Sequence, residues 1–371
     1  MRHETTCPLS DNFLCGFLNN IWKDGWLDCF SNDHFLIHAI NDNISNYHGK
    51  KRLEENNANL FCFKSHVGMD FSINLSNKLD HLCKVFEKEQ IKKFVVDQLS
   101  AGKEHYDEDQ FFRALTEVEV LHFFSNYVYS VNKKCIYEPH IGINGKNPEA
   151  RFIFDNKVIV DIEVKTPGFS NNDILDKLLL PTVLINNDGR NALSKLCVNR
   201  NVKCLFPRVR KLVDFLNSAA SKFERPLSSM HVNLLYINWT YSEFPSKSFL
   251  EAYSILFNDL TGLLKHKEIG LQFGVSEEAY SKISAVIVYT SSLNNLVFQD
   301  FRYLWSTKNF SIIFLNGDET LITKITQMDW HLNSTAPLVL SDFKAHSIDD
   351  QVEEAYVCTK AIELINQYRL S

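Results

Sequence analysis

The feature that most constrains the fold is a stretch, residues 149 to 165, in which apolar and charged side chains alternate. Two runs, EARFIF and VIVDIEVK, flank the polar triplet Asp155-Asn156-Lys157, which is typical of a turn between two strands. Successive side chains of a strand point to opposite faces, so each run has one apolar and one charged face. The stretch therefore predicts a β-hairpin with one buried face.

The register of this hairpin follows from its apolar residues, because a slip by one residue would place apolar side chains opposite charged ones. With a three-residue turn, Ala150 lies opposite Ile162, and Glu149 lies opposite Glu163. The two carboxylates would face each other with Cβ atoms about 4.5–5.5 Å apart, which destabilises a sheet unless a positive group lies between them. A divalent cation that prefers oxygen ligands, above all Mg²⁺, would be such a group.

Three further residues share the charged face of the hairpin. Arg151 lies opposite Asp161, and a cross-strand ion pair with a structural role explains that pairing. Lys165 follows Glu163 by two residues, so it is the next side chain on the same face of the strand. It would place an ammonium beside a metal-bound water. The pattern leaves two interpretations open, a metal site or a solvated, charged face of a sheet.

The composition excludes several classes of protein. With 39 Lys and Arg against 45 Asp and Glu, the formal charge is −6, so contacts with a phosphate backbone must come from local clusters. The nine cysteines include no CxxC pair and form a poor framework for disulfides or zinc. The longest apolar runs have about eight residues, too few for a membrane span, and the first residues lack the apolar core of a signal peptide. We expect a soluble cytoplasmic protein without a membrane partner.

The hairpin lies within an alternation of helical and strand patterns. A helix that is apolar on nearly every side is expected over residues 109–127, opened by Asp107 or Asp109 as its cap. Further helices are expected over residues 77–100, 206–223, 248–265 and 352–369, and further strands over 133–141, 231–239, 282–291 and 310–317. Residues between Pro167 and the helix at 206 read as a loop. This order predicts an α/β protein with a mixed sheet.

These residues carry a resemblance to a known family. Pro148-Glu149, thirteen intervening residues and then Glu163-Val164-Lys165 resemble the motif of the PD-(D/E)XK nuclease superfamily. The family's core order of helix, three strands, helix and strand is similar to the order expected from about residue 107 to 240. The resemblance implies a restriction-endonuclease-like core with helical N-terminal and C-terminal additions. The family usually has Asp where this chain has Glu149, and the longer carboxylate leaves the activity of the site open.

The resemblance also implies roles for individual residues. Glu149 and Glu163 would hold Mg²⁺, for which Mn²⁺ would substitute, with the Val164 carbonyl as a further ligand, and Lys165 would act on the attacked phosphate and water. Glu117 would be a third acid, since it follows an Ala-Leu pair on the upstream helix as in the family. Glu119 lies about 200° further around that helix, so at most one of the two faces the site.

A cluster of positive charge follows the hairpin. Residues 189 to 213 contain no Asp or Glu, and phosphate-backbone contacts are expected from five of their basic residues, Arg200, Lys203, Arg208, Arg210 and Lys211. Such contacts would make affinity for nucleic acid depend on salt. A solvated basic loop is the alternative interpretation.

The sequence thus favours a Mg²⁺-dependent nuclease, a DNA endonuclease of restriction or defence, that acts alone, as a homo-oligomer or with a regulatory partner. The alternative is a weak or inactive protein of the same fold that acts as a nucleic-acid-binding or regulatory module. The expected division is a helical N-terminal region over residues 1–105, a nuclease domain over 106–310, and a C-terminal strand and helix over 311–371 packed on the core.

Overall fold

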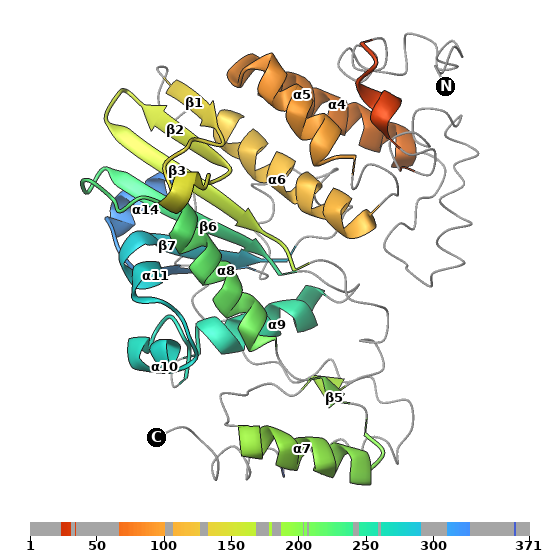
Figure 1. The fold of residues 1–371 in the computed structure, drawn as a ribbon, viewed down its shortest axis with the longest axis vertical. Helices are drawn as coiled ribbons and strands as arrows, with labels where there is room; N and C mark the ends of the chain where they lie inside the picture. Colours follow the sequence, from red (N-terminus) through yellow and green to blue (C-terminus); the bar gives the residue numbers. More distant parts are fainter. Residues whose placement is uncertain are drawn as a thin grey trace.

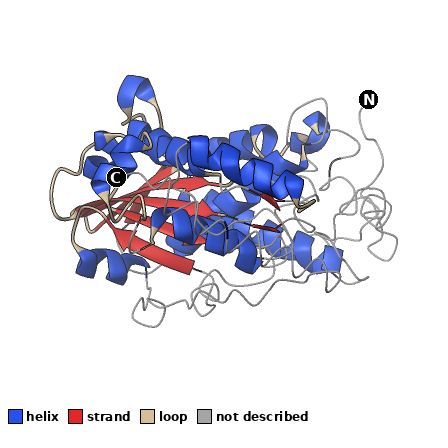
Figure 2. Cartoon of the chain, turned by 90° about the horizontal axis from the view of Figure 1, so that it is seen from below, coloured by secondary structure: helices blue, strands red, loops and turns tan. Residues whose placement is uncertain are grey.

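The computed structural model describes residues 24–30, 34, 67–100, 107–126, 133–167, 178–179, 187–202, 204–205, 208–239, 245–258, 261–290, 310–326 and 360. Within this part of the chain, a six-stranded sheet is covered by helices on both faces, as Figure 2 shows. The expected α/β class with a mixed sheet is therefore confirmed.

The sheet combines an antiparallel hairpin region with a parallel centre. Its strand order is β1-β2-β3-β6-β7-β8. The pairs β1–β2, β2–β3 and β7–β8 are antiparallel, whereas β3–β6 and β6–β7 are parallel. The strands are β1 (Lys133–Tyr137), β2 (Ala150–Phe154), β3 (Val158–Lys165), β6 (His231–Asn238), β7 (Ala285–Tyr289) and β8 (Phe310–Phe314).

Two groups of helices bury the two faces of this sheet (Figure 1). The first face packs against α4 (Val67–Val85), α5 (Lys88–Asp97), α6 (Glu108–Asn126) and α14 (Glu319–Thr326). The second packs against α8 (Val209–Lys222), α9 (Pro245–Leu256) and the short helices α10 (Lys267–Gln272) and α11 (Glu277–Lys282). The remaining described elements are the 3-10 turns η1 (Trp26–Cys29) and η4 (Ile143–Gly145), the paired strands β4 (Leu178–Leu179) and β5 (Cys204–Leu205), and α7 (Asn187–Asn199).

The β2–β3 hairpin has the register expected from its apolar residues. Ala150 pairs with Ile162, Arg151 with Asp161, and the remaining pairs follow to the turn at residues 155–157. The turn places Asp155 and Asn156 in the left-handed region, which their short polar side chains tolerate. The register prediction is confirmed, because only this pairing brings all the apolar side chains of the hairpin onto one face.

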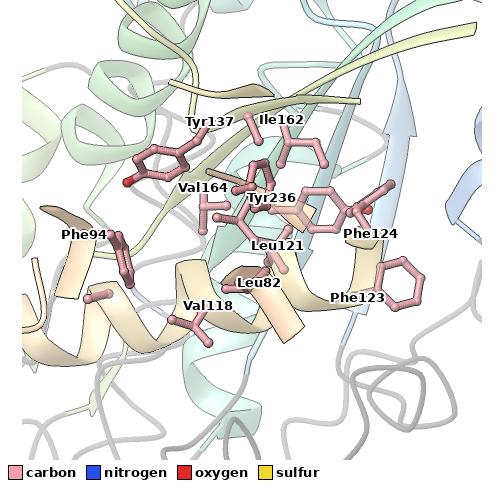
Figure 3. Close-up of a cluster of buried hydrophobic side chains, with 14 of the residues drawn as sticks. Leu82, Phe94, Val118, Leu121, Phe123, Phe124, Tyr137, Ile162, Val164 and Tyr236 are labelled. Carbon is pink, nitrogen blue, oxygen red and sulfur yellow. The ribbon is translucent and has the colours of Figure 1, made fainter. Parts of the chain in front are cut away.

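Helix α6 is the main partner of the apolar face. Its first turn is capped by Asp107, whose Oδ1 atom accepts a 3.1 Å hydrogen bond from the backbone N of Gln110, as expected. The helix is buried on nearly every side, because α4 packs on it from outside while the sheet packs on it from inside. Figure 3 shows the apolar cluster that results, in which the labelled side chains come from α4, α5, α6, β1, β3 and β6: Leu82, Phe94, Val118, Leu121, Phe123, Phe124, Tyr137, Ile162, Val164 and Tyr236.

Several element boundaries differ from those expected. The helix expected over residues 77–100 is broken at Phe86 and Glu87, and its two parts are α4 and α5. The helix expected over 248–265 ends at Leu256, because the Asn258 side chain accepts a hydrogen bond from the backbone N of Thr261 and offers the chain a turn instead. The segment after Pro167, expected as a loop, contains α7, which buries Leu193 and Cys197 at helical spacing. The helix expected at 352–369 lies outside the described residues, apart from residue 360.

The expected division into three parts stays a prediction, although packing crosses both of its boundaries. Helices α4 and α5 share one core with α6 and the hairpin, and β8 is an edge strand of the same sheet. Among the described cysteines, Cys29, Cys83, Cys135 and Cys197 are free thiols. Among the described helices, none has the length and apolar character needed to cross a membrane.

Candidate functional site

The charged face of the hairpin lies under α8 and is not solvated. The side chains of Asp161 and Glu163 are fully buried, since β3 is a central strand and α8 covers that face. Their positions are two residues apart on β3, yet they belong to two different groups of charges. The solvated-face interpretation is therefore wrong for these two carboxylates.

The first group surrounds Glu163 at the end of the hairpin where β2 begins and β3 ends. Glu149 lies just before β2, and its backbone N donates a 2.9 Å hydrogen bond to the carbonyl of Ile162, which continues the hairpin register. Lys165 forms an ion pair with Glu163 from within the same strand. The hairpin thus brings together the three residues of the expected motif.

A residue that sequence reasoning missed lies between the two carboxylates. The Nζ atom of Lys222, in the last turn of α8, lies 2.8 Å from Oε1 of Glu163 and 3.3 Å from Oε1 of Glu149. The positive group expected between these carboxylates is therefore, in this structure, an ammonium of the chain itself. A signal for it exists in the sequence, because Lys222 follows the apolar Phe215 by seven residues, which places it two turns further along the same side of an amphipathic helix.

Glu117 approaches from the other face of the sheet. The hydroxyl of Tyr137, on β1, donates a 3.2 Å hydrogen bond to Oε1 of Glu117. Glu119, two residues on, forms an ion pair with Lys78 of α4 and points away. The expectation that at most one of these glutamates faces the site is confirmed, and that residue is Glu117.

Burial and the nearby charge of Glu149 make Glu117 and Glu163 reluctant to ionise. Burial raises the pKa of Glu163 to about 7, and Glu149 adds to the increase, whereas Lys165 and Lys222 oppose it. Burial, reinforced by Glu149, raises the pKa of Glu117 well above its usual range. Burial lowers the pKa of Lys222, but Glu149 and Glu163 outweigh this effect and raise it overall. Burial therefore favours a protonated Glu117, and the two ammonium groups of Lys165 and Lys222 balance Glu149 and Glu163 when these are ionised.

The donor set fits a hard divalent cation. Glu117, Glu149 and Glu163 provide carboxylate oxygens, the ligands that Mg²⁺ prefers. Within the described part of the chain, the buried Oε2 atom of Glu163 has no hydrogen-bond partner, which leaves an acceptor for such an ion. The three carboxylates are not drawn together into a closed set of ligands in this structure. The role expected for the Val164 carbonyl stays a prediction.

The second group of charges surrounds Asp161. We call it the closed group, because both carboxylate oxygens of Asp161 already have partners within the protein. Arg151 donates two hydrogen bonds of 2.7 Å to the two carboxylate oxygens of Asp161, so the expected structural ion pair is confirmed. His231 Nε2 lies 2.9 Å from Oδ2 of Asp161, and Arg151 also pairs with Glu224. Asp161, Glu224 and His231 place three ligand atoms within 4.8 Å of one another, but the Arg151 guanidinium already binds two of these three residues.

The basic residues expected to contact nucleic acid have different surroundings. Arg200, Arg210 and Lys211 are exposed, and Lys203 lies outside the described residues. Arg208 packs over the ring of Trp239 at 4.5 Å from its centroid, and its backbone N donates to Glu251. Arg208 therefore helps to fix the start of α8, whereas Arg210 and Lys211 are the members of this cluster on α8 that face solvent.

Comparison with known proteins gives no relative. No protein-family model, curated protein sequence or solved structure matches this chain. The site is therefore interpreted from its own residues.

Proposed function

We propose that this protein is a Mg²⁺-dependent nuclease that hydrolyses phosphodiester bonds, with DNA as its substrate. The observation that carries the proposal is the convergence of Glu149, Glu163 and Lys165 at one end of a buried hairpin, with Glu117 entering from α6. Three carboxylates and a lysine on rigid elements form a constellation suited to metal-assisted hydrolysis.

The fold supports the proposed relation to PD-(D/E)XK nucleases. Helix α6, the strands β1 to β3, helix α8 and then β6 parallel to β3 follow one another in the order of the core expected from the resemblance. Within this order, the motif residues lie at the ends of paired strands. Carboxylates in such positions are held by backbone hydrogen bonds, so their separation does not depend on loop conformation.

Each residue has a role that follows from its surroundings. Glu149 and Glu163 would hold the cation, and Glu117 would bind it or orient a water molecule next to it. When bound, the metal supplies Lewis-acid stabilisation of the phosphate and lowers the pKa of a bound water. Lys165 would stabilise negative charge on the attacked phosphate, because it lies beside Glu163 and keeps part of its side chain exposed.

Nucleic acid would approach along α8. Arg210 and Lys211 are exposed near the start of this helix, and Lys222 lies at its end, so one helix carries both surface charge and a residue of the site. Twelve residues of α-helix span about 18 Å, which is the length of a few nucleotides of backbone. Contacts of this kind are sequence-independent and weaken with salt.

One observation favours the second candidate, a nucleic-acid-binding or regulatory module without activity. Lys222 supplies a positive charge to the two carboxylates that a metal would otherwise bridge. A protein that had lost its metal would need such a charge to keep two buried carboxylates together. The two candidates differ in whether the folded protein binds and uses a divalent cation.

Cleavage of supercoiled plasmid and of single-stranded DNA, each with Mg²⁺ or Mn²⁺, tests the proposal. We expect metal-dependent cleavage by the wild type and a loss of about 10²–10⁴-fold in rate for Lys165→Ala. Lys157→Ala is the matched control, because Lys157 is an exposed lysine in the turn of the same hairpin. Cleavage by Lys165→Ala at the wild-type rate would disprove the assignment, and metal binding without cleavage by the wild type would favour the second candidate.

A further inference from the structure

The position of Lys222 suggests how metal binding to this site is controlled. Its Nζ atom lies within 3.3 Å of carboxylate oxygens of both Glu149 and Glu163, the two residues proposed to hold the metal. We propose that the Lys222 ammonium is an internal competitor of the metal ion, which occupies the cation position in the free protein and must leave it before the metal binds. This inference rests on the proposed function, since it concerns the same site.

The charges of the site explain why the two cations exclude each other. Glu149 and Glu163 carry two negative charges when ionised, and Lys165 and Lys222 balance them. A divalent ion added to this arrangement would leave an excess of two positive charges in a largely buried space, where repulsion is weakly screened. Removal of the Lys222 ammonium to solvent relieves half of this excess and frees Oε1 of Glu163, which both lysines now share.

The backbone at Lys222 is fixed by packing against a neighbouring loop, whereas its side chain is partly exposed to solvent. A Cβ atom on Gly142 would lie 2.5 Å from the Lys222 carbonyl oxygen, so the loop between β1 and β2 packs directly on the end of α8. Lys146 of this loop donates a 3.1 Å hydrogen bond to Ser221, which fixes the same turn. The Lys222 side chain keeps 23% of its surface exposed. The ammonium can therefore move to water by side-chain rotation alone.

This arrangement stabilises the metal-free protein and weakens its affinity for metal. Without a cation, the two facing carboxylates would repel each other in a buried setting. The ammonium removes this repulsion, but the free energy of its ion pairs is lost whenever a metal replaces it. A neutral side chain at position 222 should then have the opposite effects, a less stable free protein and tighter metal binding.

Calorimetric titration of the full chain with Mn²⁺ in the absence of nucleic acid tests the competition. We expect Lys222→Met to bind Mn²⁺ with a Kd about tenfold lower than the wild type and to gain more in Tm when Mn²⁺ is added. Lys146→Met is the matched control, because Lys146 contacts the same turn of α8 through Ser221. This control should bind Mn²⁺ as the wild type does.

A second measurement needs no variant and so does not depend on how Lys222→Met folds. Reaction of the wild type with an amine-reactive label, followed by mass spectrometry, reports the accessibility of each lysine. Labelling of Lys222 should increase several-fold with saturating Mn²⁺, while labelling of Lys146 should stay constant.

The outcomes separate this inference from the proposed function. If the wild type binds Mn²⁺ and cleaves DNA, but Lys222→Met binds no tighter and Lys222 labelling does not change, the competition is disproved and the nuclease stands. If neither the wild type nor a folded Lys222→Met binds Mn²⁺, both proposals fail. Tighter binding by Lys222→Met together with Mn²⁺-dependent labelling of Lys222 establishes the competition.

Discussion

Two groups of charged side chains lie side by side on β3, and their difference shows how one strand carries both a structural and a chemical function. Around Asp161, a bidentate arginine and a histidine satisfy a single buried carboxylate. Around Glu163, burial and then the charge of Glu149 raise the pKa of Glu163 to about 7, against the opposing effect of Lys165 and Lys222. Two residues of separation on one strand therefore divide an ion-pair network in which both carboxylate oxygens are bound from a site in which one buried carboxylate oxygen has no hydrogen-bond partner among the described residues.

Burial of a charged side chain does not by itself identify a functional site in this protein. Both carboxylates are fully buried, and both have a positive partner across the hairpin or from α8. What distinguishes Glu163 is the repulsion from the facing Glu149 and an Oε2 atom without a hydrogen-bond partner in the described part of the chain. In a structural network the buried polar atoms are paired, whereas a site that awaits a ligand leaves an acceptor unpaired.

The largest effect on stability should come from removal of the arginine that binds Asp161. Arg151→Met leaves Asp161 buried without its bidentate partner, and such a change typically costs about 3–5 kcal/mol of the free energy of unfolding. Urea denaturation measures this loss. Arg225→Met, at an exposed position next to Glu224, is the control and should stay within about 0.5 kcal/mol of the wild type. A loss of less than about 1 kcal/mol for Arg151→Met would contradict the structural role.

A substitution in the group around Glu163 should have an intermediate effect on the free energy of unfolding, with the opposite sign. Glu163→Gln removes a buried charge that is costly to ionise, so the metal-free protein should gain on the order of 2 kcal/mol at pH 8. The matched change Asp161→Asn should instead destabilise the protein, because Arg151 and His231 lose a charged partner. If Glu163→Gln and Asp161→Asn changed the free energy of unfolding in the same direction, the contrast between the two groups would be disproved.

The same substitution should alter the dependence of stability on pH. Glu163 has a pKa raised from 4.5 to about 7, so between these values the folded protein keeps a proton that the unfolded chain has released. The wild type should therefore lose stability as pH rises through this interval, and above pH 7 the contribution is absent. Thermal unfolding at several pH values should show a shallower decline for Glu163→Gln than for the wild type.

The smallest effect should come from Glu117. Burial and the charge of Glu149 favour its neutral form in the metal-free protein, so Glu117→Gln replaces a neutral acid with a neutral amide of the same shape. We expect a change of less than about 0.5 kcal/mol in the free energy of unfolding at pH 7. Glu119→Gln is the matched comparison on the same helix and should cost more, because it breaks the buried ion pair with Lys78. A large loss for Glu117→Gln would mean that Glu117 is ionised and paired.

Much of the fold was predictable because local pattern and packing agree. Alternation in the hairpin predicted its register, since only one pairing buries all its apolar side chains. Residue type and spacing predicted the burial of α6 and a cap at Asp107 or Asp109, of which the structure shows Asp107. The break between α4 and α5, the early end of α9 and the presence of α7 were not predicted. At the first two places a local turn, with extended backbone at Glu87 and the Asn258 side chain bound to the Thr261 backbone, ends a helical pattern. At α7 the helical spacing of Leu193 and Cys197 was present in the sequence but was read as part of a loop.

The sequence by itself determined the hairpin, the shared face of Glu149, Glu163 and Lys165, and the opposite directions of Glu117 and Glu119 on their helix. These follow from the periods of strands and helices, which fix side-chain direction without knowledge of neighbours. Only the tertiary structure decided that α8 covers the charged face and places Lys222 between the two carboxylates. The pairing of His231 with Asp161, residues 70 positions apart, was likewise decided there. Such contacts depend on how separate elements pack, and no local period in the chain encodes that packing.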